Sequence, residues 1–365
     1  TKIVTLASLK ANSDVLAGEI TGSMDVSGIM SGDMTKPTAI KLSGKDFSLG
    51  LMPMFEAPWP FASADVEASL SPDMQKLTIV NAKIVTGGMT GAGSGEFWLD
   101  GPPEARQLGV KINALGTGTI TPQQVTAFWP VNLGPGARLW VRDRIPSGRA
   151  TKAVFVMDMP PGGLAKGYLD NEHLSLDFTV DNATVKFLDD FPAATNVTGV
   201  GRLKGNSLVV DVTGGRMTTW QVDEGKITLP QFAPKGKMMN VAVIGRGDLG
   251  QMMRVLDASN LKVGSKYGLQ VDQMKGTGGI EVHVQRPMQD VVPNDSILYS
   301  VKGGFREAAA PNLVSGFGLT SSDVTFDLNQ DGMQITGAGQ LGPAPVVFDW
   351  KERFVHSGDN GSELT

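Results

Sequence analysis

Residues 174–180 have the sequence LSLDFTV, in which apolar and polar side chains alternate at every position. A period of two places Leu174, Leu176, Phe178 and Val180 on one face of a β-strand and the polar side chains on the other. Antiparallel sheets with one dry and one wet face have this pattern. The stretch therefore predicts a strand of antiparallel sheet whose apolar side faces away from water.

The same alternation recurs at residues 108–114, 208–212, 280–284 and 324–328. The dry sides of these strands and of the 174–180 strand are the candidate groove-lining residues Leu108, Val110, Ile112, Leu174, Leu176, Phe178, Val180, Leu208, Val210, Val212, Ile280, Val282, Val284, Val324, Phe326 and Leu328. Which of them meet a ligand, and which meet a covering helix, is left open by the pattern.

Turn-forming residues separate the apolar runs at short intervals. The segments that read as hairpin turns are residues 91–95 (GAGSG), 204–206 (KGN), 213–215 (TGG), 223–225 (DEG) and 330–332 (QDG). Together with the alternation, these turns predict a mainly β fold of antiparallel strands.

Helices are predicted at three places. Thr121 followed by Pro122 favours a helix start, and this helix runs to Trp129. A second short helix covers residues 137–145. A third covers residues 249–258, where apolar residues at helical spacing follow Asp248. All three have the character of packing elements or lids.

The number of strands has a geometric consequence. Roughly 20 strands spaced about 4.8 Å apart would make a sheet on the order of 100 Å long. Open sheets rarely exceed about 10 strands without curling or splitting. A curled sheet with a dry concave face is a groove, which side chains, helices or an apolar ligand must fill. We therefore expect curled antiparallel sheets that form a hydrophobic groove, with a few short helices.

Composition narrows the classes of function. The chain of 365 residues has a formal charge of −5, no cysteine and three histidines. The charge provides no basic field for nucleic acid, and the lack of cysteine removes thiolate nucleophiles and disulfides. His173, His283 and His356 lie on unrelated segments and are expected at the surface. We predict no catalytic residue, no metal site and no cofactor.

The chain has no stretch of 18 or more apolar residues that would span a bilayer. Its ends suggest an internal piece of a longer protein, whose anchor lies outside it. We expect three parts: an N-terminal β-groove segment (1–115), a short helical connection (116–150) and a C-terminal β-groove segment (151–365).

Several landmarks, taken in order, resemble one family. The segments 128–130 (FWP) and 137–141 (ARLWV) are similar to a signature of the AsmA-like proteins of the YhdP type. The further landmarks are residues 187–192 (FLDDFP), 197–201 (VTGVG), 225–230 (GKITLP), 337–341 (GAGQL) and 348–354 (FDWKERF). They extend over about two thirds of the chain.

The resemblance implies a periplasmic segment of an inner-membrane-anchored protein in a Gram-negative bacterium. It also implies taco-shaped β-sheets whose hydrophobic channel carries phospholipid acyl chains between the inner and outer membranes, in support of outer-membrane lipid homeostasis. Such a carrier needs aliphatic walls and no reactive residues. Arg138, Arg142 and Arg144 are either a solvated helix face or contacts for lipid phosphates.

Two other classes of function stay open. Curled sheets also suit a scaffold or chaperone in outer-membrane protein assembly, which would pair its edges with client strands. Residues 245–250 (GRGDLG) match G-x-G-x-x-G, with Asp272 about 20 residues further on, as in nicotinamide-dependent enzymes. That interpretation requires a parallel sheet around residues 241–272, whereas the flanking sequence is rich in hairpins.

Overall fold

A computed structural model of the chain describes residues 2–33, 35–50, 54–163, 167–259, 262–293, 296–314, 316–354 and 362–364. Strands make up 62% of the chain. Consecutive strands pair antiparallel in the N-terminal and the C-terminal half of the chain, for example with Phe97 opposite Val110 and Val241 opposite Val284. The prediction of a mainly β, antiparallel fold with few short helices is confirmed.

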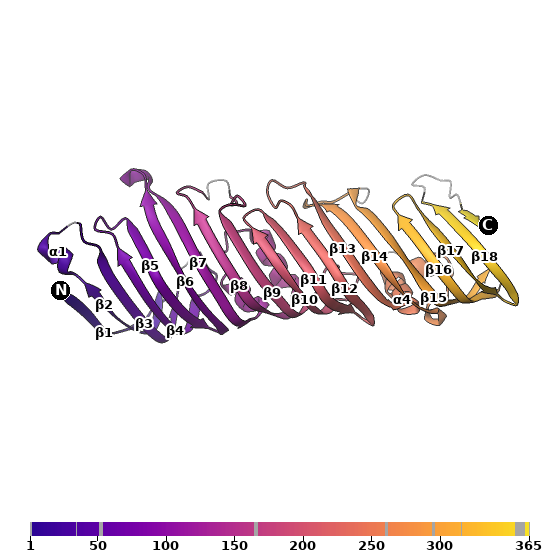
Figure 1. The fold of residues 1–365 in the computed structure, drawn as a ribbon, viewed down its shortest axis with the longest axis horizontal. Coiled ribbons are helices and arrows are strands. Elements are labelled where there is room, and N and C mark those ends of the chain that lie inside the picture. Colours follow the sequence, from indigo (N-terminus) through magenta and orange to yellow (C-terminus); the bar gives the residue numbers. More distant parts are fainter. Residues whose placement is uncertain are drawn as a thin grey trace. The chain divides into compact units, whose positions relative to one another are not determined.

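The chain forms two compact units, and the first consists of residues 1–181 and 201–207. Its strands and helices are β1 (Ile3–Asn12), β2 (Leu16–Asp25), α1 (Ser27–Ser31), β3 (Thr38–Leu49), β4 (Trp59–Leu70), β5 (Lys76–Thr86), β6 (Gly88–Asp100), the 3-10 turn η1 (Pro103–Ala105), β7 (Gln107–Ile120), α2 (Pro122–Ala127), α3 (Pro135–Arg144) and β8 (Ser147–Met159). Each strand from β1 to β8 pairs with the next along the chain, so this sheet is a meander (Figure 1).

The second unit consists of residues 182–200 and 208–365. Its elements are β11 (Ser207–Met217), β12 (Trp220–Leu229), β13 (Met238–Asp248), α4 (Leu249–Ala258), α5 (Val263–Lys266), the 3-10 turn η2 (Val271–Gln273), β14 (Lys275–Pro287), β15 (Leu298–Val314), β16 (Phe317–Asn329), β17 (Gly332–Leu341), β18 (Ala344–Arg353) and β19 (Ser362–Leu364). These strands also pair in chain order. The strands β9 (Leu174–Val185) and β10 (Ala194–Lys204) contain residues of both units.

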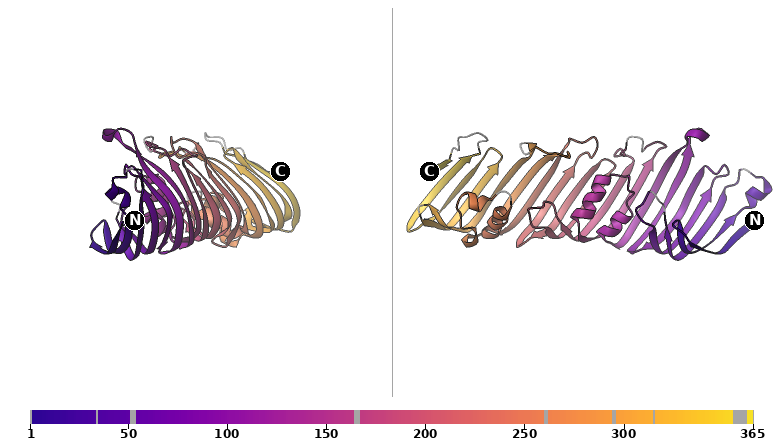
Figure 2. Two further views of the ribbon diagram at one scale, coloured as in Figure 1. Left: turned by 60° about the vertical axis from the view of Figure 1, so that its left-hand side comes forward. Right: turned by 180° about the vertical axis from the view of Figure 1, so that it is seen from behind.

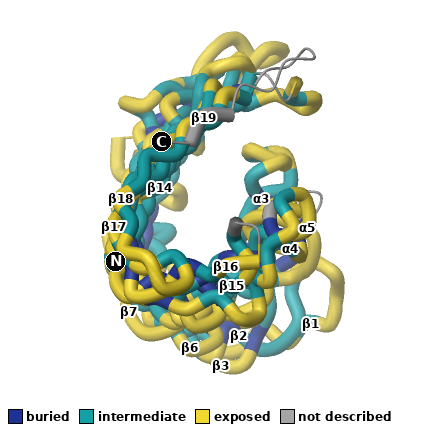
Figure 3. The backbone as a smooth tube through the Cα atoms, turned by 90° about the vertical axis from the view of Figure 1, so that its right-hand side faces the viewer, coloured by how far each residue is buried: buried dark blue, intermediate teal, exposed yellow. Residues whose placement is uncertain are grey.

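Within each unit the strands bend along their length, which gives the sheet a concave and a convex side (Figure 2). The helices α2, α3 and α4 lie on the concave side, in the view from behind in Figure 2. Most strand residues are half-buried or exposed, and buried segments are short (Figure 3). Within the described residues each unit is therefore a single curved layer, and no second sheet covers its concave side.

Two of the three predicted helix starts are confirmed by side-chain hydrogen bonds. The helix predicted at 137–145 begins two residues earlier, as α3, and the helix predicted to run to Trp129 ends at Ala127. At α2 the hydroxyl of Thr121 accepts from the Gln124 backbone N–H at 3.3 Å, and the Gln124 side chain accepts from the Thr121 N–H at 2.9 Å. This reciprocal pair is a capping box. At α4 the Asp248 carboxylate accepts from the Gln251 N–H at 2.7 Å. The helices α1 and α5 span only five and four residues and were not predicted.

Two of the predicted turns are confirmed, and three are wrong. Residues 204–206 and 330–332 connect β10 to β11 and β16 to β17, but residues 91–95, 213–215 and 223–225 lie inside β6, β11 and β12. Glycine inside a strand can mark a close approach of backbone or a bulge rather than a turn.

Close backbone approach and a strand bulge both occur at these misassigned turns. A Cβ on Gly93 would lie 2.5 Å from the Asn113 carbonyl oxygen, and one on Gly95 would lie 2.7 Å from the Lys111 carbonyl oxygen. In β12 the register with β13 shifts between Val222 and Glu224. These glycines therefore permit tight strand contacts and bulges within continuous strands.

The predicted helical connection, residues 116–150, contains α2 and α3. The strands that flank it, β7 and β8, pair directly with each other, Ile112 opposite Met157. The division into domains at residues 115 and 151 stays a prediction. Among the described residues, no helix is long and apolar enough to cross a membrane.

Candidate functional site

The strand registers of the first unit gather apolar side chains on one face of its sheet. Phe97 lies opposite Val110, and Val110 lies opposite Met159, so an apolar row crosses β6, β7 and β8. Every second residue of a strand belongs to the same face. Further members of this apolar face are Ile40, Leu42, Val66, Ala68, Ile79, Ala82, Ile84, Ile112, Ala114, Phe155 and Met157.

The second unit has an equivalent apolar face. One row runs through Val210, Ile227, Val241, Val284 and Tyr299, each opposite the next on the neighbouring strand. A second row runs through Val243, Val282, Val301, Leu328 and Met333. Further members are Leu208, Val212, Leu229, Ile280, Phe305, Val324, Phe326, Ile335, Phe348 and Trp350.

The opposite face of each sheet carries cross-strand ion pairs, and we call it the charged face. In the first unit Lys41 lies 2.7 Å from Glu67, Lys76 lies 3.0 Å from Glu96 and Lys111 lies 3.2 Å from Asp158. In the second unit Lys302 lies 3.1 Å from Asp327, and Arg246 lies 3.2 Å from Asp223. Such exposed pairs each contribute only about 0–1 kcal/mol. Their role here is to keep this face in water.

The helices cover part of each apolar face. In the first unit Leu133, between α2 and α3, packs against the cluster of Val110, Met159, Leu169 and Leu174. In the second unit Leu249 and Met252 of α4 pack against the cluster of Trp220, Phe305 and Ala308. These two clusters hold buried residues of the two units, and most of the apolar-face residues named above lie outside them.

The candidate groove residues therefore divide into two sets. Six belong to the helix-covered clusters or pack against them: Val110, Ile112, Leu174, Ile280, Val324 and Phe326. Ten lie outside those clusters: Leu108, Leu176, Phe178, Val180, Leu208, Val210, Val212, Val282, Val284 and Leu328. Leu108 is 44% exposed, and the other nine are half-buried. Contact of any of them with a ligand stays a prediction.

Sequence reasoning missed the apolar face of β3 to β6. Its alternation is broken by glycines at residues 91, 93 and 95 and by a register shift between Ile79 and Ala82. It also missed Val241 and Val243, because the glycines that follow them read as a nucleotide-binding motif. The apolar run at residues 241–244, directly before Gly245, was the sequence signal that could have identified these two residues.

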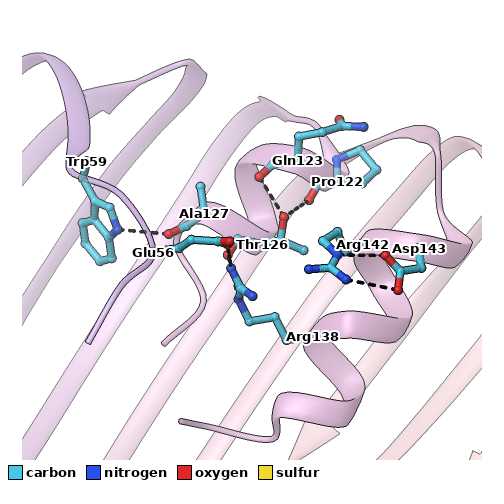
Figure 4. A network of polar contacts seen from close by, with 9 residues as sticks. All are labelled: Glu56, Trp59, Pro122, Gln123, Thr126, Ala127, Arg138, Arg142 and Asp143. Atoms are coloured by element: carbon cyan, nitrogen blue, oxygen red, sulfur yellow. Dashed lines mark hydrogen bonds and ion pairs between the residues drawn. The ribbon is translucent and has the colours of Figure 1, made fainter. Parts of the chain in front are cut away.

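Arg138 is the most buried charged side chain near the α2–α3 segment, with 7% of it exposed. Its Nε donates to the Thr126 carbonyl oxygen at 3.2 Å, and its guanidinium bonds the carboxylate of Glu56 in the loop before β4 (Figure 4). That hydrogen bond, followed by the charges of Arg138 and Arg142, holds the pKa of Glu56 below its usual value.

The two interpretations offered for the arginines do not fit Arg138. It is neither on a solvated helix face nor free for a phosphate, because it ties α3 to α2 and to Glu56. Arg142 bonds Asp143 at 2.8 Å and remains about half exposed. The Trp59 indole N–H adds a bond to the Ala127 carbonyl oxygen at 3.2 Å. The α2–α3 segment is thus fixed to the sheet by polar contacts as well as by Leu133.

The G-x-G-x-x-G match has a structural explanation. Gly245 and Gly247 lie in β13, which is antiparallel to both β12 and β14, so the parallel sheet required for a dinucleotide site is not present. A Cβ on Gly247 would lie 2.7 Å from the indole of Trp220, a side chain that is 5% exposed. Asp248 caps α4. The glycines make room for a core tryptophan.

The histidines that the structure describes lie near the surface. His283 is on the charged face, with its Nε2 2.6 Å from a Glu281 oxygen, and His356 lies outside the described residues. His173 Nδ1 lies 2.8 Å from the Asp158 carbonyl oxygen. Its ring is also near Asp170 and Glu172, but acidic groups of this kind are common without a metal, and no site is assigned to them.

Comparison with known proteins identifies a family. No curated protein and no solved structure matches the chain. The profile of the YhdP protein family, in contrast, matches residues 7–360, which is nearly the whole chain and includes parts of both units. With its antiparallel fold and two apolar faces, the chain belongs to the YhdP protein family.

Proposed function

We propose that the chain is a non-enzymatic lipid-transfer segment, whose apolar faces carry phospholipid acyl chains between the inner and outer membranes. It would act in the periplasm, as part of a protein anchored in the inner membrane of a Gram-negative bacterium. Membership of the YhdP family supports a role in the bacterial envelope. The acyl chains and the two membranes are its proposed partners.

One observation carries the proposal. In the part of the chain that the structure describes, each unit has a half-buried apolar face that no second sheet covers, and behind it a charged face. A protein that needed these side chains only for its own core would cover them, since a large uncovered apolar patch favours aggregation. An apolar ligand that comes and goes accounts for the uncovered face.

The energetics agree with this role. Each methylene removed from water contributes about 0.8 kcal/mol, so a long acyl chain in water costs on the order of 10 kcal/mol. A continuous apolar face removes most of this barrier along the path. The polar head group can stay in water at the open side of the sheet, which requires no reactive side chain.

Aspartate substitutions on the two faces of one unit test the proposal. The chain is purified from a bacterial envelope, and bound lipid is measured by native mass spectrometry and lipid extraction. Val210→Asp and Val282→Asp place a charge on the uncovered apolar face and are expected to abolish lipid binding. Ile244→Asp is the matched control: Ile244 lies opposite Glu281, on the charged face, and is 39% exposed.

The outcomes are distinct. Lipid on the wild-type chain and on Ile244→Asp, but not on the other two variants, with circular dichroism unchanged, supports the carrier. A folded wild-type chain that neither holds lipid nor extracts it from liposomes contradicts it. That result would instead favour the scaffold for outer-membrane protein assembly.

A further inference from the structure

The segment between β13 and β14 reaches across the apolar face of the second unit. It consists of α4 and of residues 262–273, and we call it the strap. Its first part packs on the core through Leu249 and Met252. Its far part reaches β18, where the Tyr267 hydroxyl donates to a Glu352 carboxylate oxygen at 2.8 Å. The strap therefore starts after β13 and makes contact at β18, four strands beyond β14.

The contact at β18 lies on the apolar face itself. Trp350 lies opposite Ile335, which lies opposite Phe326, and Glu352, two residues after Trp350, is on the same side of the strand. The Tyr267 ring meets the Trp350 ring edge-on, with centroids 6.1 Å apart. One hydrogen bond to a carboxylate and one aromatic contact thus hold the strap to β18. We call this pair of contacts the latch.

Polar contacts connect α4 to the second part of the strap, residues 262–273. The Asp257 carboxylate at the end of α4 accepts from the Ser265 N–H at 2.7 Å and from its hydroxyl at 3.1 Å. Arg254 lies 3.9 Å from Asp272 on the returning segment. These bonds join the outgoing and returning parts of the strap to each other.

The latch contrasts with the attachment of the α2–α3 segment. That segment is held by the buried Arg138, by the Trp59 indole and by a backbone bond from Val131 to Met54 at 2.9 Å. Tyr267 and Glu352, in contrast, are half-buried, so water can compete for the hydrogen bond between them. Burial and Glu352 raise the pKa of Tyr267 to about 12, so the hydroxyl keeps its proton at physiological pH.

We propose that the far part of the strap, residues 262–273, is a gate over the acyl path of the second unit, and that the latch must open for a lipid to load from the side. The inference rests on the proposed function. The face on which the strap makes its contacts also carries Val282, Val284, Val301 and Leu328, which lie outside the cluster that α4 covers. With the latch closed, an acyl chain passes along these residues, and with it open, a chain enters sideways from a bilayer.

Covalent locking of the strap tests the gate directly. The chain has no cysteine, so Tyr267→Cys combined with Glu352→Cys gives the only two thiols. A cleavable bifunctional thiol reagent of about the length of the two lost side chains joins them. Uptake of a fluorescent phospholipid from liposomes by the 365-residue chain is then followed over time. Lys302→Cys with Asp327→Cys, a neighbouring pair on the charged face, is the matched control.

The gate predicts that cross-linking slows lipid uptake at least tenfold, that cleavage of the reagent restores it, and that the control pair is unaffected. Tyr267→Phe, which keeps the ring contact and loses the hydrogen bond, is expected to load several-fold faster than wild type. Equal uptake rates for locked and cleaved protein would refute the gate while leaving the carrier function intact. A wild-type chain that takes up no lipid would overturn both.

Discussion

Gly247 shows how a single residue sets the packing of the second unit. A Cβ at this position would lie 2.7 Å from the Trp220 indole, which donates from its Nε1 to the Asp248 carbonyl oxygen at 2.9 Å. We predict that Gly247→Ala forces this buried ring to shift and lowers the free energy of unfolding by about 1–3 kcal/mol. Denaturant unfolding followed by tryptophan fluorescence measures the change.

The control for this prediction is Gly136→Ala in α3. No atom lies within 4 Å of a Cβ there, and alanine favours a helix by up to about 1 kcal/mol. We therefore expect equal or greater stability for Gly136→Ala. If Gly247→Ala unfolds at the same denaturant concentration as wild type, the space occupied by Trp220 does not explain the glycine.

At this scale the sequence predicted which way a side chain faces, but not what covers it. Alternation alone placed Val282 and Ile280 on one face, as the registers show. It could not tell that Ile280 packs against a helix-covered cluster and Val282 does not. That difference depends on where α4 folds back, which is a property of tertiary packing rather than of local pattern.

At the scale of elements, the anchoring of the α2–α3 segment depends on pH. Arg138 holds the pKa of Glu56 below its ordinary value of 4.5. A lowered pKa in the folded state means that the stabilisation is present above the unfolded pKa and is lost as pH falls through the folded pKa. We predict that hydrogen-exchange protection of residues 122–144 decreases below about pH 4.5.

Glu56→Gln separates this contact from general acid effects. The amide cannot titrate, so protection of residues 122–144 should be lower than in wild type at neutral pH and should change less on acidification. Residues of β14 and β15 provide an internal reference, since they belong to the other unit. An unchanged acid response in Glu56→Gln would show that another group anchors the segment.

The elements themselves were predictable where local chemistry specifies them. Thr121 and Asp248 each signal a helix start, and both cap helices through their side chains. Residues 91–95 were misread, because a run of glycines is as compatible with a turn as with a strand. Only the close carbonyl oxygens of the neighbouring β7, remote in sequence, require glycine at these positions of β6.

At the scale of the whole molecule, both units divide their surfaces in the same way. Each apolar face is built of aliphatic and aromatic side chains, and the ion pairs lie behind it. Binding of a lipid to such a surface becomes more favourable with every methylene removed from water. It depends little on the identity of the head group. The proposed carrier should therefore discriminate between lipids by acyl length more than by head group.

This argument leads to a quantitative prediction for binding. At about 0.8 kcal/mol per methylene, and with 1.4 kcal/mol per tenfold in affinity, the Kd should fall by up to roughly fourfold for each added methylene. Lysophospholipids of increasing chain length, titrated below their micellar concentrations by calorimetry, provide the series. Exchanging an ethanolamine for a glycerol head group at constant chain length should change the Kd less than one methylene does. A Kd that follows the head group and ignores chain length would place recognition in polar contacts and would contradict an acyl path along the apolar faces.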